Sequence, residues 1–202
     1  RSSRPTQRRL TRGIVALLAL AAVTCSDDGG PGPDRLGHVT GAVWLSEPVR
    51  GASIEVVRWD GLVGAIVCQT TTDDAGAFDC YVEKSFGDFY VRARGGQTRD
   101  SGSDLTLAAA AELRAPVLGF VPAEQRAVTV SPASELIVAV GLARQAAGRE
   151  PDLAAAMTRA HALVTEHLEV DPVAVAPATL ASATSLTEAV KLAVFLRGLA
   201  SF

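Results

Sequence analysis

Residues 39–45 read Val39-Thr40-Gly41-Ala42-Val43-Trp44-Leu45, and residues 51–56 read Gly51-Ala52-Ser53-Ile54-Glu55-Val56. In both stretches apolar residues alternate with polar or small ones, which is the pattern of a half-buried β-strand. Similar runs lie at residues 62–72, 78–82 and 89–93, separated by segments rich in Gly, Asp and Pro. Short strands at regular spacing indicate a small β-sandwich.

Helical patterns follow these strands. Ser131-Pro132 offers a capping hydroxyl and a proline for a first helix that runs to Gly148. A second pattern opens at Pro151, and a third opens at the capping-box sequence Ser185-Leu186-Thr187-Glu188. We therefore predict an α+β chain with about three helices after the sandwich. The predicted apolar faces consist of Leu136, Ile137, Val140, Ala143 and Ala147; of Leu153, Ala156, Met157, Ala160, Leu163, Val164, His167 and Leu168; and of Val190, Ala193, Val194 and Leu196.

The segment between the sandwich and the helices has a mixed pattern. We predict one strand near 112–118 and another near 127–130. Whether they extend the sandwich or pack on the helices is left open by the sequence. The chain stops at Phe202 inside the third helical pattern with no glycine beyond it, so we expect the helical region to be truncated.

The beginning of the chain has the pattern of a secretory signal. Five arginines between Arg1 and Arg12 precede an apolar run from Ile14 to Ala22, and Cys25 follows shortly after it. A membrane-spanning helix needs about 20 apolar residues, more than this run provides. Residues 1–24 are therefore predicted to be a signal peptide that is cleaved after export.

The end of this signal, Ala22-Val23-Thr24-Cys25, resembles the signals of bacterial lipoproteins, in which small residues precede a cysteine that accepts lipid. The resemblance implies lipidation of Cys25 and a membrane anchor in the cell envelope, at the outer membrane or the cell surface. Residues 25–36 would be a flexible Gly- and Pro-rich tether. Thr24 departs from the family pattern, and cleavage by a different peptidase, giving a periplasmic or secreted protein, is the alternative.

Charge limits the choice of partner. Loss of residues 1–24 removes five of the 19 basic side chains and none of the 22 acidic ones, so 14 remain against 22 and the net charge is −8. We therefore expect no nucleic-acid partner.

Cys68 and Cys80 form a pair once Cys25 is assigned to lipid, and disulfides persist in exported proteins. The turn at residues 73–76 lies midway between them, so two antiparallel strands would place them opposite one another. We predict a disulfide, with two buried free thiols as the alternative. Their spacing excludes a CxxC-type redox or zinc site.

Four segments resemble the carboxypeptidase regulatory-like domain: Val39–Val43, Gly51–Val56, Thr72–Phe78 and Phe89–Ala93. The resemblance covers residues 37–96 and implies a transthyretin-like, immunoglobulin-like sandwich. Such domains are accessory modules beside enzymes, transporters and adhesins, and the family brings no catalytic residues. Residues 97–130 would then be connecting extended segments and residues 131–202 a helical region.

Clusters of polar residues suggest few chemical sites. Thr72, Asp73 and Asp74 are candidates for calcium, but Asp and Gly in this order are typical of a tight turn. His161 and His167, six residues apart on one helix, cannot share a metal ion, and we interpret them as solvated and helix-terminal. Glu166, Glu169 and Asp171 are interpreted as a solvated helix end. Trp44 and Trp59 are interpreted as core or sheet-edge residues, with an exposed aromatic patch as the alternative.

No catalytic group can be nominated. The sequence has no G-x-S-x-G, H-E-x-x-H or glycine-rich phosphate motif, and Ser131, Ser134 and Ser185 occupy helix-cap positions. We therefore expect no enzymatic activity, cofactor or metal, and a lipid-anchored envelope protein with a binding or assembly role, whose partner is an envelope protein or a glycan. The alternatives are an accessory part of an exported peptidase or glycan hydrolase, and a secreted carbohydrate- or peptide-binding module.

Overall fold

The computed structural model describes residues 36–59, 64–82, 87–100, 103–121, 123–180 and 183–199. The chain divides into two compact units, residues 1–30 and 31–202, and all described residues belong to the second. The predicted signal, its acceptor Cys25 and all but the last residue of the tether lie outside the described residues.

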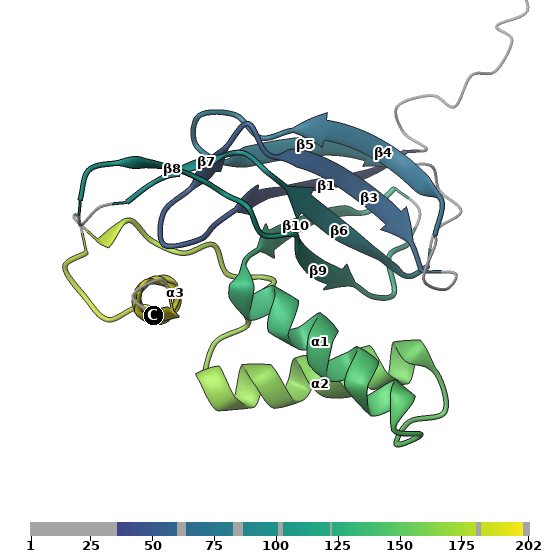
Figure 1. Cartoon of the computed structure of the whole chain (residues 1–202). Coiled ribbons are helices and arrows are strands. Elements are labelled where there is room, and N and C mark those ends of the chain that lie inside the picture. The colour runs from purple at the N-terminus through teal and green to yellow at the C-terminus, as the bar shows by residue number, and fades with distance from the viewer. Residues whose placement is uncertain are drawn as a thin grey trace, which may run out of the picture. The chain divides into compact units, whose positions relative to one another are not determined.

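Within the described residues, strands come first and three helices follow, so the predicted α+β class is confirmed (Figure 1). The elements are β1 Gly37–Val43, β2 Val49–Arg50, β3 Ser53–Arg58, β4 Ile66–Thr71, β5 Ala77–Val82, β6 Phe89–Arg94, β7 Gln97–Arg99, β8 Thr106–Ala108, β9 Leu113–Val117, β10 Gln125–Val130, α1 Pro132–Ala146, α2 Leu153–Leu168 and α3 Glu188–Leu199.

The described strands form three sheets, with orders β10-β1-β5, β4-β3-β6-β9 and β2-β7-β8. β1 and β10 run parallel, while the other strand pairs are antiparallel. The two strands predicted near 112–118 and 127–130 are β9 and β10, and both extend the sheets, β9 beside β6 and β10 beside β1. The short strands β2, β7 and β8 were not predicted.

The two larger sheets share one apolar core. In β1, Val39 and Val43 are buried while His38 and Thr40 lie on the opposite, outer face, as the alternation of the sequence predicts. Inward residues of both sheets join one cluster with residues of α1 and α2, and its largest members include Val39, Ile54, Val56, Phe78, Phe89, Val91, Ile137 and Val164. This cluster is the main source of stability, because burial of apolar surface drives folding.

Cys68 and Cys80 form the predicted disulfide, with their Cα atoms 6.1 Å apart. The predicted hairpin is wrong, however, because β4 pairs with β3 and β5 pairs with β1. The turn between the two strands carries the chain from one sheet to the other, which lets both strands face the shared core. The disulfide therefore links the two sheets at one edge.

Helices α1 and α2 pack side by side, and α1 also lies against β9 and β10 (Figure 1). Ser131 and Ser134 form a reciprocal capping box at the start of α1, and Asp152 caps α2. The face predicted for α2 is largely confirmed, with Ala156, Met157, Ala160 and Val164 buried. The face predicted for α1 is rotated, since Ala133, Ser134, Ile137, Val138 and Gly141 are buried whereas Leu136 is 44% exposed.

Helix α3 packs on a second, smaller apolar cluster, to which α1 also contributes. Its buried residues Leu192 and Leu196 contact a small cluster that also contains Trp44, Ala133 and Val170. The hydroxyl of Thr187, rather than that of Ser185, accepts a hydrogen bond from the N–H of Val190 at 3.3 Å. Val194, predicted on the apolar face, is exposed.

Candidate binding surfaces

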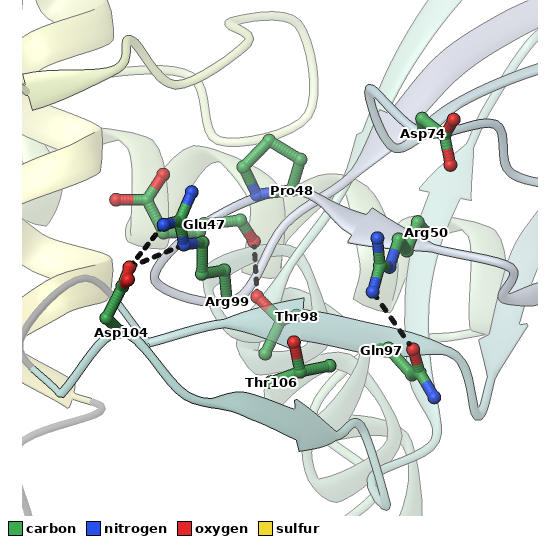
Figure 2. Close-up of a pocket in the computed structure, with 9 residues that line it drawn as sticks. All are labelled: Glu47, Pro48, Arg50, Asp74, Gln97, Thr98, Arg99, Asp104 and Thr106. Atoms are coloured by element: carbon green, nitrogen blue, oxygen red, sulfur yellow. Dashed lines mark hydrogen bonds and ion pairs between the residues drawn. The ribbon is translucent and has the colours of Figure 1, made fainter.

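A surface hollow of about 410 Å³ lies over the small sheet β2-β7-β8. It is lined by Glu47, Pro48, Arg50, Asp74, Gln97, Thr98, Arg99, Asp104 and Thr106 (Figure 2). The register explains this composition, because Arg50 pairs with Gln97 across one ladder and Arg99 pairs with Thr106 across the next. Residues opposite one another in a sheet share a face, so these four side chains project together.

Two contacts order part of this hollow. Arg99 donates from Nε to Oδ1 of Asp104 at 2.7 Å, and Arg50 donates from Nη2 to the side-chain oxygen of Gln97 at 3.3 Å. The buried Thr98 donates its hydroxyl to the carbonyl oxygen of Glu47 at 3.2 Å, which ties β7 to the preceding loop. These contacts therefore hold the side chains of Arg99, Arg50 and Thr98 in place without a ligand.

Arg50 and Asp74 carry charges at this hollow that no described residue of opposite charge neutralises. Within the described part of the chain, Arg50 pairs with no carboxylate and the side chain of Asp74 has no hydrogen-bond or ion-pair partner. Figure 2 shows Asp74 and Asp104 at opposite sides of the hollow. An exposed cation and an exposed anion beside amide and hydroxyl groups can bind a polar ligand through hydrogen bonds.

The residues Thr72, Asp73 and Asp74 make a structured turn. Oδ1 of Asp73 accepts hydrogen bonds from the N–H groups of Ala75 and Ala77 at 2.9 and 2.8 Å, and Gly76 has a φ of 74°. The buried hydroxyl of Thr72 donates to the carbonyl of Val49 and accepts from the N–H of Ala52. These contacts are those of the predicted turn, and they fix the position of Asp74 beside the hollow. Among the described residues, no group of three or more His, Cys, Asp or Glu is placed to hold a metal ion.

His161 and Asp171 form an ion pair that the spacing in the sequence does not reveal. Nε2 of His161 lies 2.9 Å from Oδ1 of Asp171, and the same oxygen accepts hydrogen bonds from the N–H groups of Val173 and Ala174. Burial alone would raise the pKa of Asp171, but these hydrogen bonds and the charge of His161 lower it below its usual value. The interpretation of both residues as solvated is only partly right, because their side chains are 29% and 35% exposed and pair with each other where the chain turns back after α2.

The outer face of the four-stranded sheet carries a row of alternating charges. Glu55 lies 2.5 Å from a guanidinium nitrogen of Arg92, and Arg114 on the neighbouring strand pairs with Glu135 of α1 at the same distance. Burial would raise the pKa of Glu55, but the hydrogen bond and charge of Arg92, with Gln69 and Arg94, lower it. The hydrogen bond from Arg114 to Glu135 raises the pKa of Arg114. This row is internally paired and fastens α1 to the sheet.

The outer face of the sheet β10-β1-β5 carries an aromatic pair. The rings of His38 and Tyr81, opposite each other on β1 and β5, stack with centroids 4.4 Å apart and planes 3° apart. Nε2 of His38 also lies 2.7 Å from Oδ2 of Asp79, two residues before Tyr81. Tyr81 is 56% exposed. The sequence could not reveal this cluster, because its two halves are separated by 41 residues.

The remaining candidates take structural positions. Trp44 is buried in the cluster beneath α3, and Trp59 contacts the ring of Tyr90 edge-on, as expected for core and sheet-edge residues. Ser131 and Ser134 are fully buried in the capping box of α1. Over the described residues, no helix is both long and apolar enough to cross a membrane.

Comparisons with known proteins identify no family. No family model matches this chain, and no curated protein matches it. Among solved structures, a 9R-lipoxygenase from Cyanothece PCC8801 is 20% identical over 48% of this chain and 16% of that chain, with a TM-score of 0.32. An (S)-allantoin synthase is 19% identical over 49% of this chain and 41% of that chain, also with a TM-score of 0.32. The chain thus spans less than half the length of either protein, and the similarity is too low to carry an argument about function.

Proposed function

We propose that this protein is a lipid-anchored protein of the cell envelope with a non-catalytic binding or assembly role. The anchor is supported by the five arginines, the short apolar run and the small residues that precede Cys25. Two or more acyl chains on this cysteine would hold the protein on a membrane without a spanning helix.

The observation that supports a binding role is the hollow over β2-β7-β8. Arg50 and Asp74 present charges there that no described residue neutralises, and Gln97 and Thr106 add donors and acceptors. Side chains of this kind, placed around a concave surface by a sheet and a fixed turn, bind polar ligands or partner loops. The proposed role is therefore recognition of a polar partner at the envelope.

The finer fold assignment is also a proposal. The segments that resemble carboxypeptidase regulatory-like domains correspond to β1, β3, the turn before β5, and β6. Two packed sheets are the arrangement that a transthyretin-like, immunoglobulin-like sandwich requires, and this supports the assignment. Because one fold serves many functions, the assignment favours an accessory module without specifying its partner.

The anchor is tested by the intact mass of the protein after expression in a bacterial host, with the membrane and soluble fractions compared. We expect cleavage before Cys25, an added acyl mass and recovery in the membrane fraction. Cys25→Ala is the control, because it removes the acceptor thiol and should give an unlipidated product. A wild-type product without acyl mass, found in the soluble fraction, would overturn the anchor and indicate a periplasmic or secreted protein.

The binding role is tested by recovery of partners from solubilised envelope fractions with the full chain as bait. Arg50→Ala should lose the recovered partner, while Arg149→Ala should retain it, because Arg149 is an exposed arginine outside the hollow. Equal recovery by both variants would show that the hollow is not the binding surface.

A further inference from the structure

A second surface, on the outer face of the sheet β10-β1-β5, has the features of a carbohydrate platform. Its residues follow from the strand registers: Gln125, His38 and Tyr81 form one row across the three strands, and Ala127, Thr40 and Asp79 form the next. Ala42 and Ala77 form the next row, where Ala42 packs against the small apolar cluster of α3 and so ends the open face. Every second residue of a strand projects to the same side, so these side chains lie together.

The aromatic pair gives this surface a fixed apolar element. His38 covers one face of the Tyr81 ring, and the remaining exposure of Tyr81 leaves much of the ring open to solvent. The 2.7 Å contact from His38 to Asp79 fixes the orientation of the imidazole, and the imidazole in turn supports the phenol ring. A rigid tyrosine loses little conformational entropy on binding, which is why tyrosine is common at recognition sites.

Hydrogen-bonding groups surround the aromatic pair. In the described part of the chain, the hydroxyls of Thr40 and Tyr81 and the side-chain amide of Gln125 have no hydrogen-bond partner, and Asp79 is bonded through one oxygen only. These groups supply both donors and acceptors at the height of the sheet surface. The small side chains of Thr40 and Ala127, in the row next to the rings, leave room beside them.

The chemistry of this face distinguishes among ligand classes. It carries no Lys or Arg among its described residues, so it does not favour a phosphate or an acidic ligand. The main chain of β1, which carries His38 and Thr40, is hydrogen-bonded on both sides within the sheet, so an extended peptide cannot pair with this strand. A pyranose ring presents C–H groups on a face for the tyrosine and hydroxyls at its rim for Asp79, Thr40 and Gln125.

We propose that this face binds a neutral oligosaccharide, with Tyr81 as the stacking residue and Asp79, Thr40 and Gln125 as hydrogen-bonding residues. The inference rests on the proposed binding role and names its ligand class, but it makes no use of the lipid anchor or of the hollow around Arg50. A glycan of the envelope would supply such a ligand.

The test is titration of the full chain with cellotetraose and with chitotetraose, followed by saturation-transfer NMR to identify the contacting sugar protons. We expect saturable binding of at least one of these neutral probes, with magnetisation transferred to ring C–H protons. Tyr81→Ala should weaken that binding by about tenfold or more, whereas Tyr81→Phe should retain most of it because the ring remains. Arg149→Ala, an exposed position outside both surfaces, should leave the affinity unchanged.

Folding of each variant is checked by circular dichroism and by the mass of the intact disulfide. Absence of saturable binding of both probes would overturn the inference, and so would an affinity that a folded Tyr81→Ala retains within about twofold. Loss of binding in Arg50→Ala with retention in Tyr81→Ala would also overturn it, while assigning the sugar to the hollow and leaving the proposed binding role intact. Failure of the anchor would appear only in the Cys25 experiment.

Discussion

Helices α1 and α2 both contribute residues to the large apolar cluster, whereas the buried residues described for α3 lie in the small one, to which α1 also contributes. Ile137 of α1 and Val164 of α2 lie in the same apolar cluster as the inward residues of both large sheets. Leu192 and Leu196 of α3 lie instead in a small cluster with Trp44, Ala133 and Val170. Because the stability of a helix in a protein comes mainly from the apolar surface it buries, the two regions should differ in how firmly they are held.

The largest effect is expected from Phe89→Ala, in the centre of the large cluster. Phe89 is fully buried and contacts the ring of Phe120 edge-on. Its truncation should lower the free energy of unfolding by about 3–5 kcal/mol, because a large cavity replaces the ring. Chemical denaturation followed by circular dichroism measures this, and the sheets should unfold together with α1 and α2. Leu105→Ala, at an exposed position, is the control and should change stability by less than about 0.5 kcal/mol.

Separate transitions for the sheets and for the α1–α2 pair in Phe89→Ala would contradict the assignment of both to one core.

Loss of the disulfide should have the next largest effect. Replacing both Cys68 and Cys80 by serine should lower the free energy of unfolding by about 2–3 kcal/mol, because the bond restricts the unfolded chain. The same loss should follow reduction of the wild-type protein and should be absent on reduction of the serine variant. Cys25→Ser is the matched control for loss of a cysteine. An unchanged denaturation midpoint after reduction would show that the link between the two sheets contributes little.

Asp171 lies where the two cores meet. The preceding apolar residue, Val170, belongs to the small cluster, while Val173 belongs to the large one, and the carbonyl of Val173 accepts a hydrogen bond from the N–H of Thr129 on β10 at 2.7 Å. Asp171→Asn removes the charge paired with His161 and should cost about 1 kcal/mol. Denaturation at several pH values measures this cost.

The stabilisation contributed by Asp171 should change with pH in a defined direction. The pKa of Asp171 is lower in the folded protein than in the unfolded chain, so its charge contributes stability above the unfolded pKa, and this contribution is lost as the pH falls through the folded value. The difference in stability between the wild type and Asp171→Asn should therefore be largest near neutral pH and shrink on acidification. A difference that grows as the pH falls would contradict the lowered pKa. His167→Ala, which removes an exposed histidine of the same helix, is the control.

The sequence predicts single strands and helices of this fold better than it predicts which distant segments pair with one another. Alternation located β1, β3, β5 and β6, and the capping residue Ser131 located α1, because these signals depend on neighbouring residues. The bond between Cys68 and Cys80 was predicted from cysteine count and spacing. The pairing of the two strands that carry these cysteines was predicted wrongly. Whether they form a hairpin or belong to different sheets depends on a core formed by distant residues.

The candidate surfaces could not be predicted from the sequence either, because each joins residues of distant segments. The hollow joins Arg50, Asp74 and Gln97 from three separate segments, and the carbohydrate platform joins His38 with Tyr81 across β1 and β5. His161 was interpreted as solvated from its spacing to His167 on the same helix. Its actual partner, Asp171, lies beyond the end of that helix, so helical spacing could not reveal the contact. Strands β7 and β8 have three residues each, too few for alternation to be distinguished from a loop.

The smallest effect on global stability is expected from Leu196→Ala in α3, although its local effect should be large. Leu196 is almost fully buried, but its neighbours are the few residues of the small cluster. Its loss should open α3 while the sheets remain folded, so amide hydrogen exchange should accelerate in residues 188–199 by about tenfold or more with the protection of β3 and β6 unchanged. Val194→Ala, on the exposed side of the same helix, should leave exchange almost unchanged. If Leu196→Ala instead lowered the protection of β3 and β6 equally, α3 would be part of the main cooperative unit, and the division between the two cores would be one of geometry without a difference in stability.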